Sequence, residues 1–132
     1  MDNIDKRIIA ILKKNARTPF MQIAQQVDVS EGTVRNRVKE LTAQGIIKQF
    51  TIATTKDVAA VVGVITQTGT KTNSITAAIT KYVTAAYEVS GKYDIIALIP
   101  GSTAEEINTT VERIRTIAGV SDTETFTVLA QR

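Results

Sequence analysis

The stretch FMQIAQQVDVSEGTVRNRVKELTAQG, residues 20–45, predicts two short helices joined by a tight turn. Its apolar residues recur at three- and four-residue spacing and so fall on one face of each helix. They are Ile23, Ala24 and Val27 in the first half and Val34, Val38 and Leu41 in the second. Asp28 and Val29 interrupt the pattern, and Ser30 stands where an N-cap belongs. Gly45 is suited to end the second helix in a left-handed conformation.

Two helices with such a turn form the helix-turn-helix arrangement, whose second helix enters the major groove of DNA. Arginine bridges a guanine edge, asparagine an adenine edge, and lysine or threonine holds phosphates. We therefore expect Arg35 and Asn36 to touch bases, and Arg37 and Lys39 to hold phosphates. The full set of expected DNA contacts is Arg17, Ser30, Glu31, Thr33, Arg35, Asn36, Arg37 and Lys39. The alternative is an ordinary helical hairpin whose basic face is merely solvated.

Composition excludes several classes of protein. The chain of 132 residues is 43% apolar, as folded globular proteins are, and no apolar run approaches the roughly 20 residues of a membrane span. Asp2 and Asp5 break the layout of a signal peptide, which favours the cytoplasm. Cysteine and histidine are absent, so a disulfide framework, the commonest metal ligands and the usual base of a nucleophilic triad are missing. We expect no metal, no cofactor and no enzyme activity.

The positive charge is concentrated in the first third of the chain. Through Lys48 there are nine Lys and Arg against five Asp and Glu, a balance of +4. From Gln49 onward there are seven against eight, a balance of −1. The potential that attracts nucleic acid therefore belongs to the N-terminal part. A surplus of four charges is small for tight DNA binding by one chain, which favours a dimer or larger assembly.

The flanking sequence divides the chain into domains. Residues 1–48 hold a first helix, capped by Asp2 or Asn3, and the two helices above. Residues 49–57 connect the two domains: the extended pattern of Ile46, Ile47, Phe50 and Ile52 favours either a short wing or a linker strand, and residues 53–57 are polar and unpatterned. Residues 58–132 form the second domain.

Strand and helix patterns alternate through the second domain. The expected order is a strand at 59–66, a helix from a cap at Ser74, strands at 83–89 and 95–99, a helix capped by Ser102 or Thr103, and a strand at 122–129. This β-α-β-β-α-β order predicts a ferredoxin-like antiparallel sheet with both helices on one face, so the whole chain is of the α+β class. The uncovered face favours self-association through the sheets.

Three motifs then resemble one family at its spacing: IDKRIIAILKKNAR at 4–17, SEGTVRNRVKELTAQGII at 30–47 and VSGKYDIIALI at 89–99. The chain resembles a full-length member of the leucine-responsive/asparagine-operon regulator family (Lrp/AsnC), the feast/famine regulators. It departs from that family at Asp28, where glycine is usual, at Gly32 in the first turn of the second helix, and at Glu31, a negative charge near the groove. These departures leave the DNA sequence preference open.

The resemblance implies a homodimer formed through the C-terminal domains, assembled further into octamers or similar rings. It also implies an amino-acid effector bound between dimers, beside Gly91, Lys92, Tyr93 and Asp94. Turn amides suit a carboxylate, and Asp94 suits an α-ammonium. We expect this turn to face Thr123, Thr125 and Thr127, which share one face of the last strand, across a dimer–dimer boundary. The alternative is that Asp94 caps the turn and the threonines merely populate a strand.

The sequence therefore predicts a DNA-binding transcription regulator that responds to an amino acid. The alternative is an architectural protein that binds double-stranded DNA with little sequence preference and acts through oligomers. An enzyme on the ferredoxin-like domain is a poor third, because neither paired carboxylates nor a Gly-rich phosphate loop is present.

Overall fold

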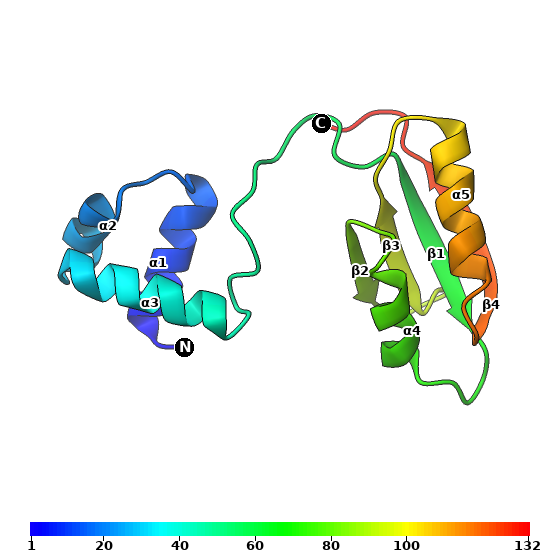
Figure 1. Ribbon diagram of the computed structural model, residues 1–132, viewed down its shortest axis with the longest axis horizontal. Helices are drawn as coiled ribbons and strands as arrows, with labels where there is room; N and C mark the ends of the chain where they lie inside the picture. Colours follow the sequence, from blue (N-terminus) through cyan, green and yellow to red (C-terminus); the bar gives the residue numbers. More distant parts are fainter. The chain divides into compact units, whose positions relative to one another are not determined.

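The computed structural model describes residues 1–132, and the chain divides into two compact units, Met1–Ile52 and Ala53–Arg132 (Figure 1). The first unit is helical, and the second is an antiparallel sheet with two helices, which together give the α+β class predicted from the sequence. None of the helices has the length and apolar character needed to cross a membrane.

The helical unit consists of α1 (Asn3–Lys14), α2 (Phe20–Val27) and α3 (Glu31–Ala43). Asp2 caps α1 and forms a capping box with Asp5. Asp28, after α2, takes a left-handed conformation with φ of 59°, which an aspartate tolerates better than most residues. Ser30 caps α3, because its hydroxyl accepts from the Thr33 amide at 3.1 Å. The sequence predicted the cap at Ser30 and left that of α1 open between Asp2 and Asn3, of which the structure uses Asp2.

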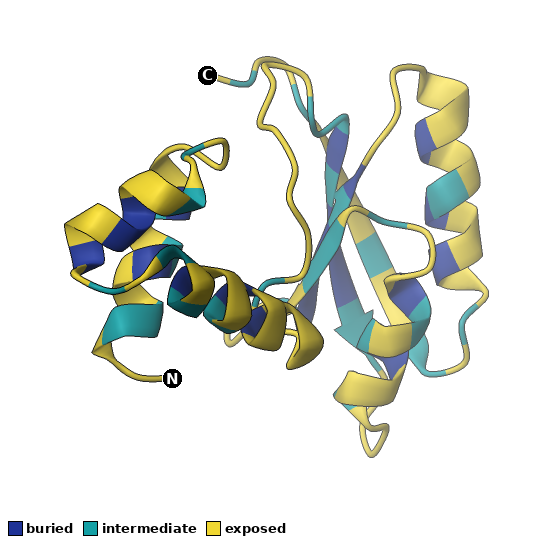
Figure 2. Cartoon of the chain, turned by 60° about the vertical axis from the view of Figure 1, so that its left-hand side comes forward, coloured by how far each residue is buried: buried dark blue, intermediate teal, exposed yellow.

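One small apolar core holds the three helices together. Its buried members are Ile8, Leu12, Ile23, Ala24, Val27, Val34 and Val38. They recur at helical spacing, and in Figure 2 buried and exposed segments alternate along each of the three helices. α3 ends in a Schellman motif, in which Gly45 has φ of 75° and the Ile46 amide donates to the Leu41 carbonyl.

The connection after α3 contains neither a wing nor a linker strand, so that expectation is wrong. Residues 54–58 are instead held by side chains, because Gln131 Oε1 accepts from the Asp57 and Val58 amides while its Nε2 donates to the Thr54 carbonyl. Hydrogen bonds from the Thr54 hydroxyl and amide lower the pKa of Asp57. These side-chain bonds occupy four backbone groups that a strand pairing would otherwise use.

The second unit has the predicted β-α-β-β-α-β order. It comprises β1 (Ala60–Thr66), α4 (Thr72–Ile79), β2 (Ala85–Glu88), β3 (Ile95–Ile99), α5 (Ala104–Arg115) and β4 (Val120–Thr127). The strands lie in the order β2-β3-β1-β4, all antiparallel, as in ferredoxin-like folds. Thr103 caps α5. The cap at Ser74 is wrong, because the N-cap of α4 is Lys71, three residues earlier, and it makes no side-chain cap.

One face of the sheet is buried under α4 and α5, and no helix of this unit covers the other, open face (Figure 1). The buried cluster combines Ala60, Val62 and Val64 of β1, Ile95, Ala97 and Ile99 of β3, Ile75 and Ile79 of α4, and Ile107, Val111 and Ile114 of α5. Alternation along the paired strands assigns the opposite side, here the open face, to Val61, Gly63, Tyr87, Ile96, Leu98 and Phe126. Tyr87 is 54% exposed and Phe126 47% exposed, so this face carries large apolar groups in contact with solvent.

Candidate functional site

The outer face of α3 is the part of the helical unit that is built to meet a ligand. Val34, Val38 and Leu41 are buried, and Arg35, Asn36 and Lys39 are exposed on the sides that the helical spacing turns away from them (Figure 2). Asn36 and Lys39 make no hydrogen bond or ion pair within the chain, so their polar groups are free for an external partner.

Arg35 is exposed but already has two neighbours. Its Nη2 donates to Glu31 Oε1 at 2.5 Å, one helical turn earlier, and its Cζ lies 5.9 Å from the centroid of the Phe20 ring on α2. The sequence presented Glu31 as a negative charge near the groove. The structure gives it a further role, because it holds the Arg35 guanidinium beside the start of α3 and neutralises part of its charge.

Arg37 does not lie with the other DNA candidates. Its Nη1 donates to Asp2 Oδ2 at 2.5 Å and to Asp5 Oδ1 at 3.2 Å, both in the first turn of α1. The backbone amide of Asp5 and the Arg37 guanidinium together lower the pKa of Asp2, and the two carboxylates raise that of Arg37. These two ion pairs compete with a phosphate for the Arg37 guanidinium, whose other nitrogens make no hydrogen bond within the chain, so its DNA contact stays a prediction.

Three other candidates have local structural roles or none. The hydroxyls of Ser30 and Thr33 are 2.8 Å apart and belong to the cap of α3. Arg17 is exposed between α1 and α2, and its backbone amide donates to Asn15 Oδ1 while its side chain contacts no carboxylate. These residues border the outer face of α3 in sequence, and their DNA contacts remain predictions.

The turn at residues 89–94 is anchored at both ends and free in the middle. The Val89 amide donates to the Asp94 carbonyl at 3.0 Å, and the Asp94 amide donates to the Val64 carbonyl of β1 at 2.9 Å. The backbone amides from Ser90 to Tyr93 donate no hydrogen bond within the chain, and Gly91 has φ of 130°. Free amides of a compact turn are the groups expected to receive a carboxylate.

The carboxylate of Asp94 anchors this turn. Its Oδ2 accepts from the Thr66 amide at 2.8 Å and from the Thr66 hydroxyl at 3.0 Å, whereas its Oδ1 accepts no hydrogen bond within the chain. Both interpretations of Asp94 therefore have a basis in the geometry, since one oxygen holds the turn and the other is available to a cation.

The three threonines lie on the opposite side of the sheet from this turn. Thr123, Thr125 and Thr127 pair with Val64, Val62 and Ala60, the residues of β1 that face the helices. Arg115 of α5 donates to the Thr123 hydroxyl at 3.0 Å, on the same covered side. The Tyr93 ring instead lies on the open face, against Gly63 and Phe126.

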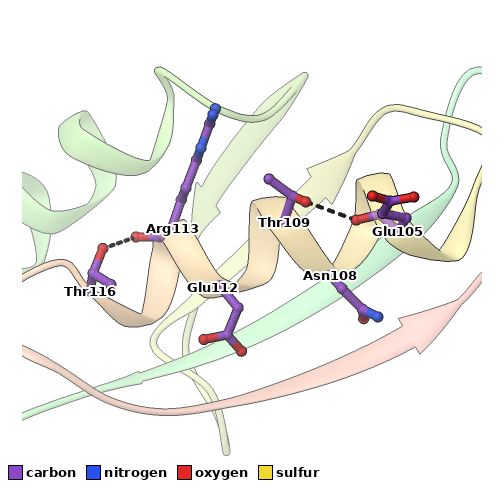
Figure 3. Close-up of a pocket in the computed structure, with 6 residues that line it drawn as sticks. All are labelled: Glu105, Asn108, Thr109, Glu112, Arg113 and Thr116. Atoms are coloured by element: carbon purple, nitrogen blue, oxygen red, sulfur yellow. Dashed lines mark hydrogen bonds between the residues drawn. The ribbon is translucent and has the colours of Figure 1, made fainter.

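Within one chain the Tyr93 ring and these threonines are thus on opposite faces of the sheet, and the expected contact across a dimer–dimer boundary stays a prediction. A groove beside the N-terminal end of α5 contains Thr125 and Thr127 together with linker residues such as Lys56. A second, shallow hollow runs along the exposed side of α5 and is lined by Glu105, Asn108, Thr109, Glu112, Arg113 and Thr116 (Figure 3). Its side chains do not converge on a common point in Figure 3, and Arg113 lies over the ring of Tyr82. No group of three or more His, Cys, Asp or Glu side chains is arranged to hold a metal ion.

Sequence reasoning missed the residues that support the turn. Gly63 and Thr66 of β1 contact Tyr93 and Asp94 across about 30 residues of intervening chain. An isolated glycine inside a strand is the one signal that pointed to such a contact, because it often marks the close approach of another group.

Comparisons with known proteins cover both units. Residues 1–48 match a model of a winged helix-turn-helix DNA-binding domain, and residues 59–132 match the Lrp/AsnC ligand binding domain. The HTH-type transcriptional regulator LysM of Saccharolobus solfataricus is 40% identical over 133 residues, which cover 98% of this chain and 94% of that protein.

Solved structures of related proteins share the fold of this chain. That of AsnC from E. coli is 30% identical with a TM-score of 0.65, over 98% of this chain and 92% of that one. A transcriptional regulator from Neisseria meningitidis, solved in complex with L-Met, shares the fold at 20% identity and a TM-score of 0.68, over 98% of this chain and 90% of that one.

Proposed function

The chain belongs to the Lrp/AsnC family of helix-turn-helix transcriptional regulators, and on that premise we propose that it reads specific DNA sequences with α3 and responds to an amino acid. The observation that carries the proposal is the turn at 90–93, whose amides are free beside an available carboxylate oxygen. Nothing within the chain uses these groups.

The outer face of α3 supports the DNA-reading part. Arg35 and Asn36 carry the side chains that pair with guanine and adenine edges, and Lys39 carries a free ammonium for a phosphate. Glu31 offsets Arg35, and Asp2 and Asp5 offset Arg37. The sequence-independent attraction of one chain to DNA is therefore weak, which favours base reading by several chains together.

The turn supports the amino-acid part. A free α-amino acid presents a carboxylate and an ammonium a short distance apart, which match unpaired N–H donors and the Oδ1 atom of Asp94 respectively. The Neisseria meningitidis regulator, solved in complex with L-Met, supports the same class of effector. Thr123, Thr125 and Thr127 complete such a site only when they come from a neighbouring chain.

The open face supports assembly. Its exposed aromatic groups, Tyr87 and Phe126, favour a homodimer through the sheets, because association removes their apolar surface from water. Further assembly of dimers, to an octamer, would bring the turn of one dimer next to another and complete the effector site.

Footprinting with and without each standard L-amino acid tests this function. Discrete protected sites whose occupancy changes with one amino acid are expected. Continuous coating at similar affinity on all sequences would instead favour the architectural alternative.

Asp94→Asn tests the effector site more cleanly than alanine does. Its amide oxygen still accepts from Thr66, so the turn keeps its anchor, while the negative charge that pairs with the ammonium is removed. We expect the calorimetric binding signal and the response of DNA binding to be lost, with unchanged DNA affinity in the absence of amino acid. A variant that binds and responds like the wild type would move the site elsewhere. An unchanged footprint across all amino acids in the wild type would refute the response itself.

A further inference from the structure

We propose that Gly63 is a positioning residue for the effector turn. Because Gly63 has no side chain, the Tyr93 ring packs directly against its backbone, and this contact, the Tyr93 seat, holds the turn in its binding conformation. The inference rests on the proposed function, because it concerns the same turn. It adds a residue on β1 that no motif of the turn contains.

The close contact at Gly63 is the first observation. A Cβ built on this residue would lie 2.6 Å from Cδ1, 2.7 Å from Cε1 and 2.8 Å from Cγ of Tyr93, far inside van der Waals contact. Three consecutive ring atoms are about equally close, so one edge of the ring lies directly against the glycine. Every other residue at position 63 would displace the ring. Since φ of Gly63 is not positive, the constraint comes from space alone.

The ring is also held from its sides. Phe126 of β4 meets it edge-on, with centroids 6.4 Å apart and an interplanar angle of 84°, which is a favourable aromatic geometry. The Lys92 ammonium lies 5.5 Å from the ring centroid. Contacts with Gly63, Phe126 and Lys92 therefore define one position for the Tyr93 ring on the open face.

The same short piece of β1 provides the remaining anchors. Val64 accepts from the Asp94 amide, and Thr66 donates twice to the Asp94 carboxylate. Residues 63–66 thus fix the C-terminal end of the turn, through packing against Tyr93 and hydrogen bonds to Asp94. The N-terminal end is held by the Val89 amide, which donates to the Asp94 carbonyl, so the amides of Gly91 and Lys92 are left unpaired without leaving the turn loose. That is the preorganisation a small ligand requires, because ordering a mobile loop on binding would cost affinity.

The test is a double-mutant cycle on the full chain: wild type, Gly63→Ala, Tyr93→Ala and the double variant. One readout is calorimetry with each standard L-amino acid. The other is hydrogen–deuterium exchange of a peptide spanning residues 88–95, where the amides of Val89 and Asp94 are protected by hydrogen bonds in the wild type. Val61→Ala, on the same face of the same strand, is the matched control, and light scattering compares the assembly of all variants.

Gly63→Ala is expected to weaken amino-acid binding by about tenfold or more and to speed exchange in this peptide, because the added methyl group expels the ring. In the Tyr93→Ala background the same substitution should add less than about twofold, since no ring remains to be expelled. Val61→Ala should leave exchange at the turn unchanged. The Tyr93 seat would be overturned if Gly63→Ala changed affinity and exchange equally with and without the Tyr93 ring. It would also be overturned if Val61→Ala sped exchange at the turn as much as Gly63→Ala does.

The exchange readout separates this inference from the proposed function. If the wild type binds no amino acid, the proposed effector is refuted, and Tyr93-dependent acceleration of exchange by Gly63→Ala still supports the seat. Unchanged exchange overturns the seat whether or not an amino acid binds. Should Gly63→Ala fail to fold, recovery of the fold in the double variant supports the seat, and failure of both variants overturns it.

Discussion

Arg35 and Arg37 are two arginines on one helix, and the structure predicts opposite consequences of removing them. Arg35 lies on the side of α3 that is exposed, held by Glu31 and Phe20. Arg37 is enclosed by Asp2 and Asp5. Arg35→Ala should therefore weaken binding to the preferred DNA site and flatten sequence preference, while Arg37→Ala should leave sequence preference intact and lower the thermal stability of the helical unit.

The loss of DNA affinity in Arg35→Ala is the free energy of the guanine contact less that of the two contacts that Arg35 must leave to reach the base. A bidentate contact to guanine discriminates by about 1–3 kcal/mol. Leaving Glu31 costs about 0.3–0.5 kcal/mol for an exposed pair one turn apart. Leaving the Phe20 ring costs about 0.5–1 kcal/mol. The two costs together, about 0.8–1.5 kcal/mol, reduce the net loss for Arg35→Ala to about 1 kcal/mol for a guanine contact of average strength and to about 2 kcal/mol for the strongest, or roughly 5- to 30-fold in Kd.

Fluorescence anisotropy at one fixed salt concentration measures the effect, on a duplex holding a footprinted site and on a scrambled duplex of equal length. Arg37→Ala is the matched control, because it removes the same side chain two residues away. Equal losses for Arg35→Ala on both duplexes would show that Arg35 reads no base. A larger loss of sequence preference for Arg37→Ala than for Arg35→Ala would refute the assignment of faces.

Three further predictions concern the stability of the helical unit. Gly32→Ala should stabilise it by about 0.5–1 kcal/mol in thermal unfolding, because a Cβ there meets nothing closer than 4.0 Å and alanine favours the helix; a lower Tm would contradict the open space. Asp28→Ala should destabilise it by about 1 kcal/mol and Asp28→Gly should not, because the backbone there is left-handed. The Asp5 amide and Arg37 lower the pKa of Asp2 below 3.8, so its contribution to stability is complete above that pH and is lost as the pH falls through the lowered value. Melting curves from pH 2 to 7 should therefore show a smaller acid-side loss of stability for Asp2→Asn than for the wild type, and identical slopes would contradict this.

The sequence by itself determined the local elements and their inner faces. Three- and four-residue spacing placed Val34 and Val38 in the core, and cap residues marked where α1 and α3 begin. The order of strands and helices then identified the ferredoxin-like sheet. These features depend on interactions between residues a few positions apart, which spacing along the chain reports directly.

Only the tertiary structure decided which polar groups are free. The sequence provides no reason to distinguish Arg35 from Arg37, since both are arginines of the same helix. In the structure the first turn of α1 packs beside α3, and its carboxylates Asp2 and Asp5 form ion pairs with Arg37. Alternation correctly put Thr123, Thr125 and Thr127 on one face of β4, but the pairing of β4 with β1 determined that this face is the one covered by helices. The seat of Tyr93 at Gly63 likewise joins two strands across distant sequence. Strand alternation has only two outcomes, so it shows that side chains share a face, and long-range register alone selects which face that is.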